Sequence, residues 1–186
     1  MKALLLAFAL LVPPLCAQSW NKTDKTDAFT GNSYVQYTLT GKFLTPPRDG
    51  GATPPNLILQ CYPHEKKYAG KWHSAGQFIK AYVQVGAVLN HSAGEIQVMY
   101  RRDDSKAQSD SWGISTDGTS LFLSVMQADE AFYGHFMPHK MGTTPSVTKL
   151  VLMADEYLGA GVVMQFDLTG IDEIASGCGL AIYEKK

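Results

Sequence analysis

The chain has few cysteines, no long apolar segment and no concentrated charge of either sign. Only three of its 186 residues are cysteines, and they lie far apart, so nothing in the sequence resembles a zinc-binding cluster. Its 16 basic and 17 acidic residues are mixed along the chain and give a formal net charge of −1. Binding to a phosphate backbone needs a concentrated basic face, so we expect no nucleic-acid partner. We also expect no metal and no cofactor, because no phosphate-binding or metal-ligand motif is present.

The longest uninterrupted apolar run is Ala3 to Val12, at the N-terminus. A membrane-spanning helix needs about 20 apolar residues, so we expect no membrane span. Lys2 before the run and Ala17 after it complete the pattern of a secretory signal peptide. We therefore predict residues 1–17 as a signal peptide and 18–186 as a single secreted or periplasmic domain. The alternative is a lipoprotein that is acylated at Cys16.

Cys61 and Cys178 are the two cysteines that remain after cleavage behind Ala17. Two cysteines in an exported protein most simply form one disulfide, because the compartment is oxidising. We therefore predict a Cys61–Cys178 bridge that closes a long loop and stabilises the fold.

Most of the remaining chain alternates apolar and polar residues, which is typical of β-strands. The strands predicted in this way are Tyr34–Leu44, Asn56–Tyr62, Phe78–Leu89, Glu95–Arg102, Thr119–Val125, Thr148–Ala154 and Gly161–Leu168. Glycine, proline and asparagine between them mark turns, and Gly86 indicates a bend.

Two segments, Gln127–Met137 and Thr169–Gly177, have the acidic starts and the proline or glycine ends of short helices. Thr169 is a candidate cap for the second helix, and Asp167, at the end of the preceding strand, is expected to cap this helix or its turn. The sequence thus predicts a mainly β fold, a two-layer antiparallel β-sandwich with one or two short helices.

The order of several short motifs resembles a known family. These are LILQC (57–61), YRRD (100–103), WGISTDGTSLFL (112–123), QFDLTGI (165–171) and CG (178–179). In this order they are similar to small exported proteins of the VasI type, associated with type VI secretion loci, and to related uncharacterised exported proteins. The resemblance implies the sandwich, the C-terminal helix and the Cys61–Cys178 bridge. It implies no catalytic activity, because that family consists chiefly of accessory proteins.

Arg101 and Asp103 form the first candidate ligand-binding spot. Residues two apart on a strand share a face, and a guanidinium is a planar donor suited to carboxylates and sugar hydroxyls. The alternative interpretation is a cross-strand ion pair that fixes the strand register.

Trp112 and Asp117 form a second candidate, in which an indole would stack on a sugar and a carboxylate would accept its hydroxyls. The alternative places Trp112 in the core and Asp117 in a turn with Gly118. Trp72, expected in a loop, is the better stacking candidate.

His135 and His139 have the spacing of two metal ligands on a helix, but Phe136 occupies the position where a zinc protease has its catalytic glutamate. We therefore expect no catalytic metal site.

Three functions remain open. The leading hypothesis is an exported, non-enzymatic accessory or binding protein with an unknown protein or glycan partner. The second is a carbohydrate-binding module that uses Trp72, Trp112, Tyr68 and Tyr100. The third is a secreted hydrolase with an unrecognised site, for which Asp103, Asp117, Asp155, Glu156 and Asp167 are the candidate carboxylates.

Overall fold

A computed structural model describes residues 19–48, 53–68, 71–89, 94–123, 147–155 and 161–178. Within 63–68, 71–79 and 175–176 the backbone alone is described. The predicted signal peptide, the predicted helix Gln127–Met137, and His135 and His139 lie outside the described residues.

The chain is mainly β, as its alternating pattern predicted. Ten strands form one sheet in the order β1-β2-β4-β5-β8-β7-β6-β9-β10-β3, and every neighbouring pair is antiparallel. The strands are β1 (Asn21–Thr26), β2 (Ser33–Thr40), β3 (Lys42–Thr45), β4 (Asn56–Tyr68), β5 (Lys71–Gln84), β6 (Glu95–Arg102), β7 (Gln108–Ile114), β8 (Ser120–Phe122), β9 (Lys149–Ala154) and β10 (Val162–Asp167). The hydrogen-bonded ladder is therefore continuous.

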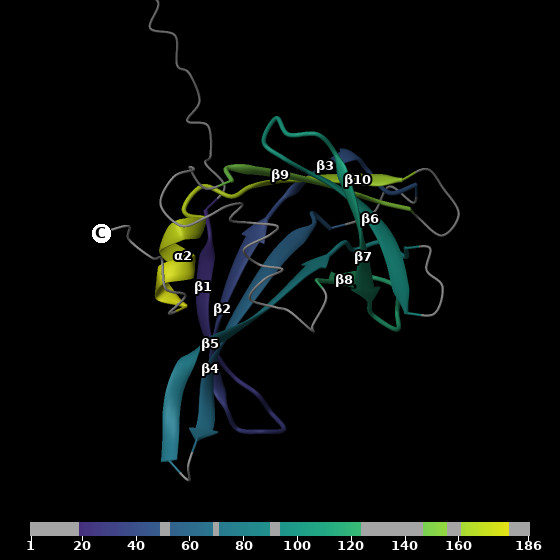
Figure 1. The fold of residues 1–186 in the computed structure, drawn as a ribbon. Coiled ribbons are helices and arrows are strands. Elements are labelled where there is room, and N and C mark those ends of the chain that lie inside the picture. Colours follow the sequence, from purple (N-terminus) through teal and green to yellow (C-terminus); the bar gives the residue numbers. More distant parts are fainter. Residues whose placement is uncertain are drawn as a thin grey trace, which may run out of the picture.

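Consecutive strands β2 and β3 belong to opposite ends of this sheet. Gly41 alone separates them, yet β2 pairs with β4 whereas β3 pairs with β10. One chain segment therefore joins the two ends, and the sheet bends over on itself around its core (Figure 1). A Cβ atom at Gly41 would lie 2.6 Å from Cε1 of Phe166, so this crossing requires glycine.

The core lies between the inward faces of the curled sheet. Alternate residues of β9 and β10 are fully or almost fully buried, whereas residues 57–61 of β4 are all buried. Phe166 of β10 and Trp112 of β7 are among the largest buried side chains. Burying each large apolar side chain stabilises a fold by about 1.5–3 kcal/mol. In β9 and β10 the alternating pattern therefore determines which face turns inward.

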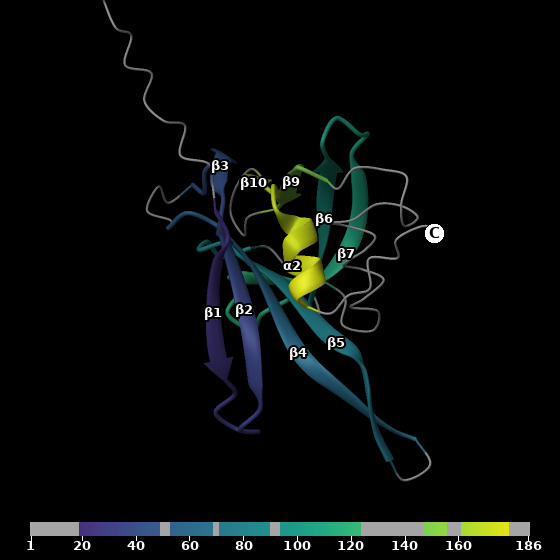
Figure 2. The same cartoon turned by 90° about the vertical axis from the view of Figure 1, so that its left-hand side faces the viewer.

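A single described helix, α2 (Ile171–Gly177), follows β10 and lies beside β1 and β2 (Figures 1 and 2). Ile171 and Ile174 turn into the core. The turn before the helix is closed by Asp167, whose Oδ1 accepts hydrogen bonds from the backbone N–H and the hydroxyl of Thr169 at 3.1 and 2.6 Å. The predicted helix is confirmed, and Asp167 holds the turn before it as predicted.

Cys178 follows α2 directly and forms the predicted disulfide with Cys61 of β4. Both cysteines are buried, their Cα atoms are 5.5 Å apart, and 117 positions separate them in sequence. The bridge fastens the last described segment of the chain to β4, the third strand in the sheet order.

Several predicted strand ends were wrong. β4 and β5 form a hairpin that projects beyond the other strands (Figures 1 and 2) and is longer than Asn56–Tyr62 and Phe78–Leu89 predicted. β5 ends at Gln84, and Gly86 bends the chain with a φ of +73°. The sequence predicted neither β1 nor β7. Among the described residues no helix is both long and apolar enough to span a membrane.

Candidate functional site

Trp112 of β7 is a core residue. Its side chain is 1% exposed and packs among the buried residues of the sheet. A sugar-stacking platform needs an exposed ring face, which an enclosed indole lacks. The structure thus confirms the alternative interpretation, in which Trp112 is a core residue.

Asp117 lies in the turn between β7 and β8. Its Oδ1 accepts hydrogen bonds from the hydroxyl of Ser115 and from the N–H and hydroxyl of Thr119, at 2.5, 3.0 and 2.9 Å. The Ser115 hydroxyl, followed by the Thr119 groups, lowers the pKa of the Asp117 carboxyl below its usual value. Gly118 has a φ of +71°, as the turn requires. The carboxylate therefore holds the turn together.

Arg101 and Asp103 do not share a strand face. β6 ends at Arg102, and Asp103 leaves the strand with a φ of +44°. Its Oδ1 accepts hydrogen bonds from the N–H and hydroxyl of Thr148 and from the N–H of Lys149, at 3.1, 2.9 and 2.8 Å. Asp103 thus fixes the start of β9, and Arg101 is exposed. Ligand binding by this pair remains a prediction.

Trp72 lies in β5 rather than in a loop, opposite Lys67 of β4. Its side chain is outside the described residues, and its role in sugar stacking remains a prediction.

A cluster that the sequence did not reveal lies on the face of the sheet opposite the core. We call it the aromatic–amide face, and define it as Tyr34 and Gln36 of β2, Gln60 and Tyr62 of β4, Lys80 and Tyr82 of β5, and Phe122 of β8. Register places these residues side by side, because Gln36 lies opposite Gln60 and Tyr82 lies opposite Phe122. Gln60 in turn lies opposite Lys80, and the rings of Tyr34 and Tyr62 are in contact. Four adjacent strands therefore contribute to one surface.

Gln60 occupies the centre of the aromatic–amide face and is only 7% exposed. Its amide Nε2 donates to Oε1 of Gln36 at 3.1 Å and to the hydroxyl of Tyr82 at 3.4 Å. Its Oε1 accepts from the hydroxyl of Tyr62 at 3.0 Å. Such a network fixes the orientation of each polar group.

Aromatic rings flank this network. The rings of Tyr34 and Tyr62 stack with centroids 4.7 Å apart, and those of Tyr82 and Phe122 lie 5.4 Å apart. The ammonium of Lys80 lies 5.5 Å above the Phe122 ring. These rings are half-buried, so each presents part of its surface to solvent.

The two tyrosines bonded to Gln60 have raised pKa values. Burial is the main cause for Tyr62 and for Tyr82, and the neighbouring Tyr34 hydroxyl adds to both. Both hydroxyls therefore stay protonated well above neutral pH and remain available as hydrogen-bond donors.

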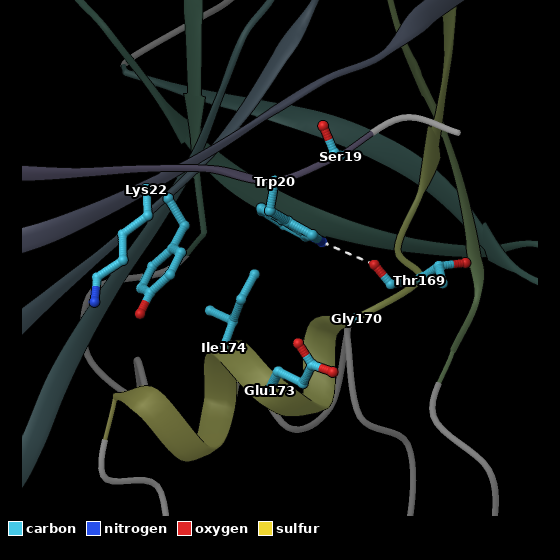
Figure 3. A pocket seen from close by; sticks show the side chains of 8 residues that line it. Ser19, Trp20, Lys22, Thr169, Gly170, Glu173 and Ile174 are labelled. Carbon is cyan, nitrogen blue, oxygen red and sulfur yellow. Dashed lines mark hydrogen bonds between the residues drawn. The ribbon is translucent and has the colours of Figure 1, made fainter. Parts of the chain in front are cut away.

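A pocket of about 470 Å³ lies between β1 and α2 (Figure 3). We call it the Trp20 pocket. Its lining residues are Ser19, Trp20, Lys22, Tyr37, Thr169, Gly170, Glu173 and Ile174. The indole N–H of Trp20 donates to the carbonyl oxygen of Thr169 at 3.2 Å and joins the two walls. The Cys61–Cys178 disulfide fastens the C-terminal end of α2 to β4.

Within the described residues, no group of three or more histidine, cysteine, aspartate or glutamate side chains could hold a metal ion. Of the five candidate carboxylates, Asp103, Asp117 and Asp167 each hold a turn or a strand start. Asp155 follows β9, and Glu156 is outside the described residues.

Comparison with known proteins finds no matching family model, no matching curated protein and no matching solved structure. The function is therefore inferred from the geometry of the chain itself.

Tyr34, Tyr62 and Tyr82 each lie within a predicted strand, at positions that alternate with core residues. That alternation was the one signal in the sequence that could have indicated the aromatic–amide face. It could not bring the three tyrosines together, because strand order and register do not follow from alternation alone.

Proposed function

We propose that this chain is an exported binding protein without catalytic activity, and that it binds a carbohydrate on its aromatic–amide face. The observation that carries the proposal is the nearly buried Gln60 amide at the centre of that face, bonded to Gln36, Tyr62 and Tyr82. A fixed amide and hydroxyl network beside half-exposed rings is a recognition surface for a ligand that is both apolar and rich in hydroxyls.

A sugar ring has this double character. Its C–H face packs on aromatic rings, and its hydroxyls both donate and accept hydrogen bonds. The Tyr82 oxygen accepts the Gln60 amide proton, so its own hydrogen can be donated outward. Tyrosine also provides a large amphipathic contact at a low cost in conformational entropy. Lys80 beside Phe122 adds one cation at the border of the face, suited to an acidic sugar.

The cellular role that we propose is that of an accessory protein in the periplasm or outside the cell, as the resemblance to the VasI-type family implies. The Cys61–Cys178 disulfide supports an oxidising compartment, because such bonds are rare in the cytosol. Carbohydrate in such a compartment is abundant at the cell surface and in the cell wall.

A glycan array that includes cell-wall and acidic polysaccharides tests the proposal, followed by calorimetry of the glycans bound. Tyr34→Ala should weaken binding at least about tenfold, and Tyr82→Phe about two- to tenfold because it removes one hydrogen bond. Tyr100→Phe in β6 is the matched control and should leave the affinity unchanged, because Tyr100 packs against the core and not on the aromatic–amide face.

Retention of the native circular dichroism spectrum by each variant separates loss of binding from loss of folding. Absence of any array signal at high protein concentration would contradict the carbohydrate assignment. Release of new reducing ends from a bound glycan would contradict the non-catalytic assignment.

A further inference from the structure

The Trp20 pocket carries two opposite charges on its two walls. Lys22 comes from β1 and Glu173 from α2, and both are exposed at the pocket. Figure 3 shows them on opposite sides of Ile174, with the Trp20 ring above it. Neither Lys22 nor Glu173 forms an ion pair with another residue that the structure describes. Both charges are therefore available to a ligand.

The floor between these charges is formed by buried side chains. Ile174 is 4% exposed and packs into the core, and Tyr37 is 8% exposed. Tyr37 lies opposite Lys22 in the β1–β2 register, so the two side chains share a face. A Cβ atom added to Gly177 would lie 3.0 Å from the Tyr37 hydroxyl, which places that hydroxyl against α2. Lys22 and Tyr37 thus form one polar end of the pocket.

We propose that the Trp20 pocket binds a short peptide through both of its free termini. The Glu173 carboxylate accepts the peptide ammonium, and Lys22 with the Tyr37 hydroxyl donates to the peptide carboxylate. The apolar side chain between the termini packs on Trp20 and Ile174. Hydrogen bonds between charged groups are roughly twice as strong as neutral ones, and they orient the ligand along the pocket.

A peptide fits this arrangement better than a free amino acid does. The ammonium and carboxylate of an amino acid are attached to the same carbon, whereas Lys22 and Glu173 lie on opposite sides of Ile174 (Figure 3). An extended chain spans about 3.3–3.6 Å per residue, so a dipeptide or tripeptide separates its termini by roughly 7–10 Å. The volume of about 470 Å³ lies within the range of about 300–1,000 Å³ found for small-molecule sites.

This site is separate from the carbohydrate surface. Tyr37 lies on the inward face of β2, whereas Tyr34 and Gln36 lie on the opposite face. The two proposals can therefore fail independently.

Calorimetry with trialanine, N-acetyl-trialanine and trialanine amide tests the peptide site on the disulfide-bonded protein. With the wild-type chain, blocking either terminus should weaken binding about tenfold, the loss expected for one charge-assisted contact. In the Glu173→Gln variant, acetylation of the peptide N-terminus should cause almost no further loss of affinity. In the Lys22→Met variant, amidation of the peptide C-terminus should cause almost no further loss.

Matched controls lie on the same two elements. Asp172→Asn in α2 and Lys25→Met in β1 change the same charges outside the pocket lining and should preserve the response to both blocked peptides. Absence of saturable trialanine binding, or equal affinity for the three peptides, would overturn the proposal. A glycan bound on the aromatic–amide face should change neither result.

Discussion

Gly41 and Phe166 are in direct contact where the two ends of the sheet meet. A Cβ atom on Gly41 would lie 2.6 Å from Cε1 of Phe166 and 2.8 Å from the carbonyl oxygen of Gln165. The N–H of Gly41 also donates to the carbonyl oxygen of Pro55 at 2.7 Å. This contact lets β2 continue into β3 and join both ends of the sheet.

Gly41→Ala should therefore destabilise the protein. Overpacking of a filled core costs about 1–3 kcal/mol, and here a backbone atom contributes to the clash. Urea unfolding of the variant measures the loss. Gly113→Ala is the control, because its Cβ would meet Phe122 at an ordinary 3.7 Å. Equal unfolding free energies of the two variants would contradict the claim that the chain crossing at Gly41 requires glycine.

The Cys61–Cys178 disulfide should provide a large part of the stability. It closes a loop across 117 positions, and on the chain-entropy model such a loop is worth about 4–5 kcal/mol. Dithiothreitol should lower the unfolding free energy by this order. The double variant Cys61→Ala/Cys178→Ala should have the unfolding free energy of the reduced protein, and dithiothreitol should not change it. An unfolding midpoint that reduction leaves in place would contradict this role.

Asp103→Ala should lower the free energy of unfolding by about 2 kcal/mol, because it removes a carboxylate oxygen that accepts three hydrogen bonds. The substitution also leaves alanine in a left-handed backbone conformation. Asp103→Asn keeps an acceptor oxygen and tolerates that conformation, so it should lose less. Asp104→Ala removes only an exposed ion pair to Lys149 at 3.5 Å and should leave thermal unfolding unchanged. If Asp103→Asn proved less stable than Asp103→Ala, the role of Asp103 in holding Thr148 and Lys149 would be contradicted.

Alkaline pH should weaken the fold through the aromatic–amide face. The pKa of Tyr82 is raised by burial and by Tyr34 and Tyr62, so the unfolded chain loses this proton at a lower pH than the folded chain does. The stability that Tyr82 contributes is complete below about pH 10 and is lost as the pH rises through the folded pKa. Urea unfolding across this pH range should show that the unfolding free energy of Tyr82→Phe falls less steeply than that of the wild-type chain. An unchanged decline would contradict the burial of this hydroxyl.

The sequence predicted the strands whose apolar residues face the core. β6, β9 and β10 alternate buried and more exposed residues, so their bounds were close to the prediction. β1 has the sequence NKTDKT and is exposed throughout, so it carries no apolar alternation and was missed. Pairing with β2 rather than burial makes it a strand.

Long-range pairing accounts for the other differences. Nothing in the sequence around Gly41 indicates that the next strand pairs with β10, so the order of the ten strands did not follow from the sequence. The aromatic–amide face was missed for the same reason. Trp112 and Asp117 were singled out for their residue types, but burial and turn geometry determine what they do.

Nuclear magnetic resonance tests the central claim most directly. A glycan selected on the array should be added to the isotope-labelled protein, and amide shifts should be followed residue by residue. We predict that the changes cluster on β2, β4, β5 and β8 around Gln60. Shifts that gather elsewhere, or none at saturating glycan, would contradict carbohydrate binding on the aromatic–amide face.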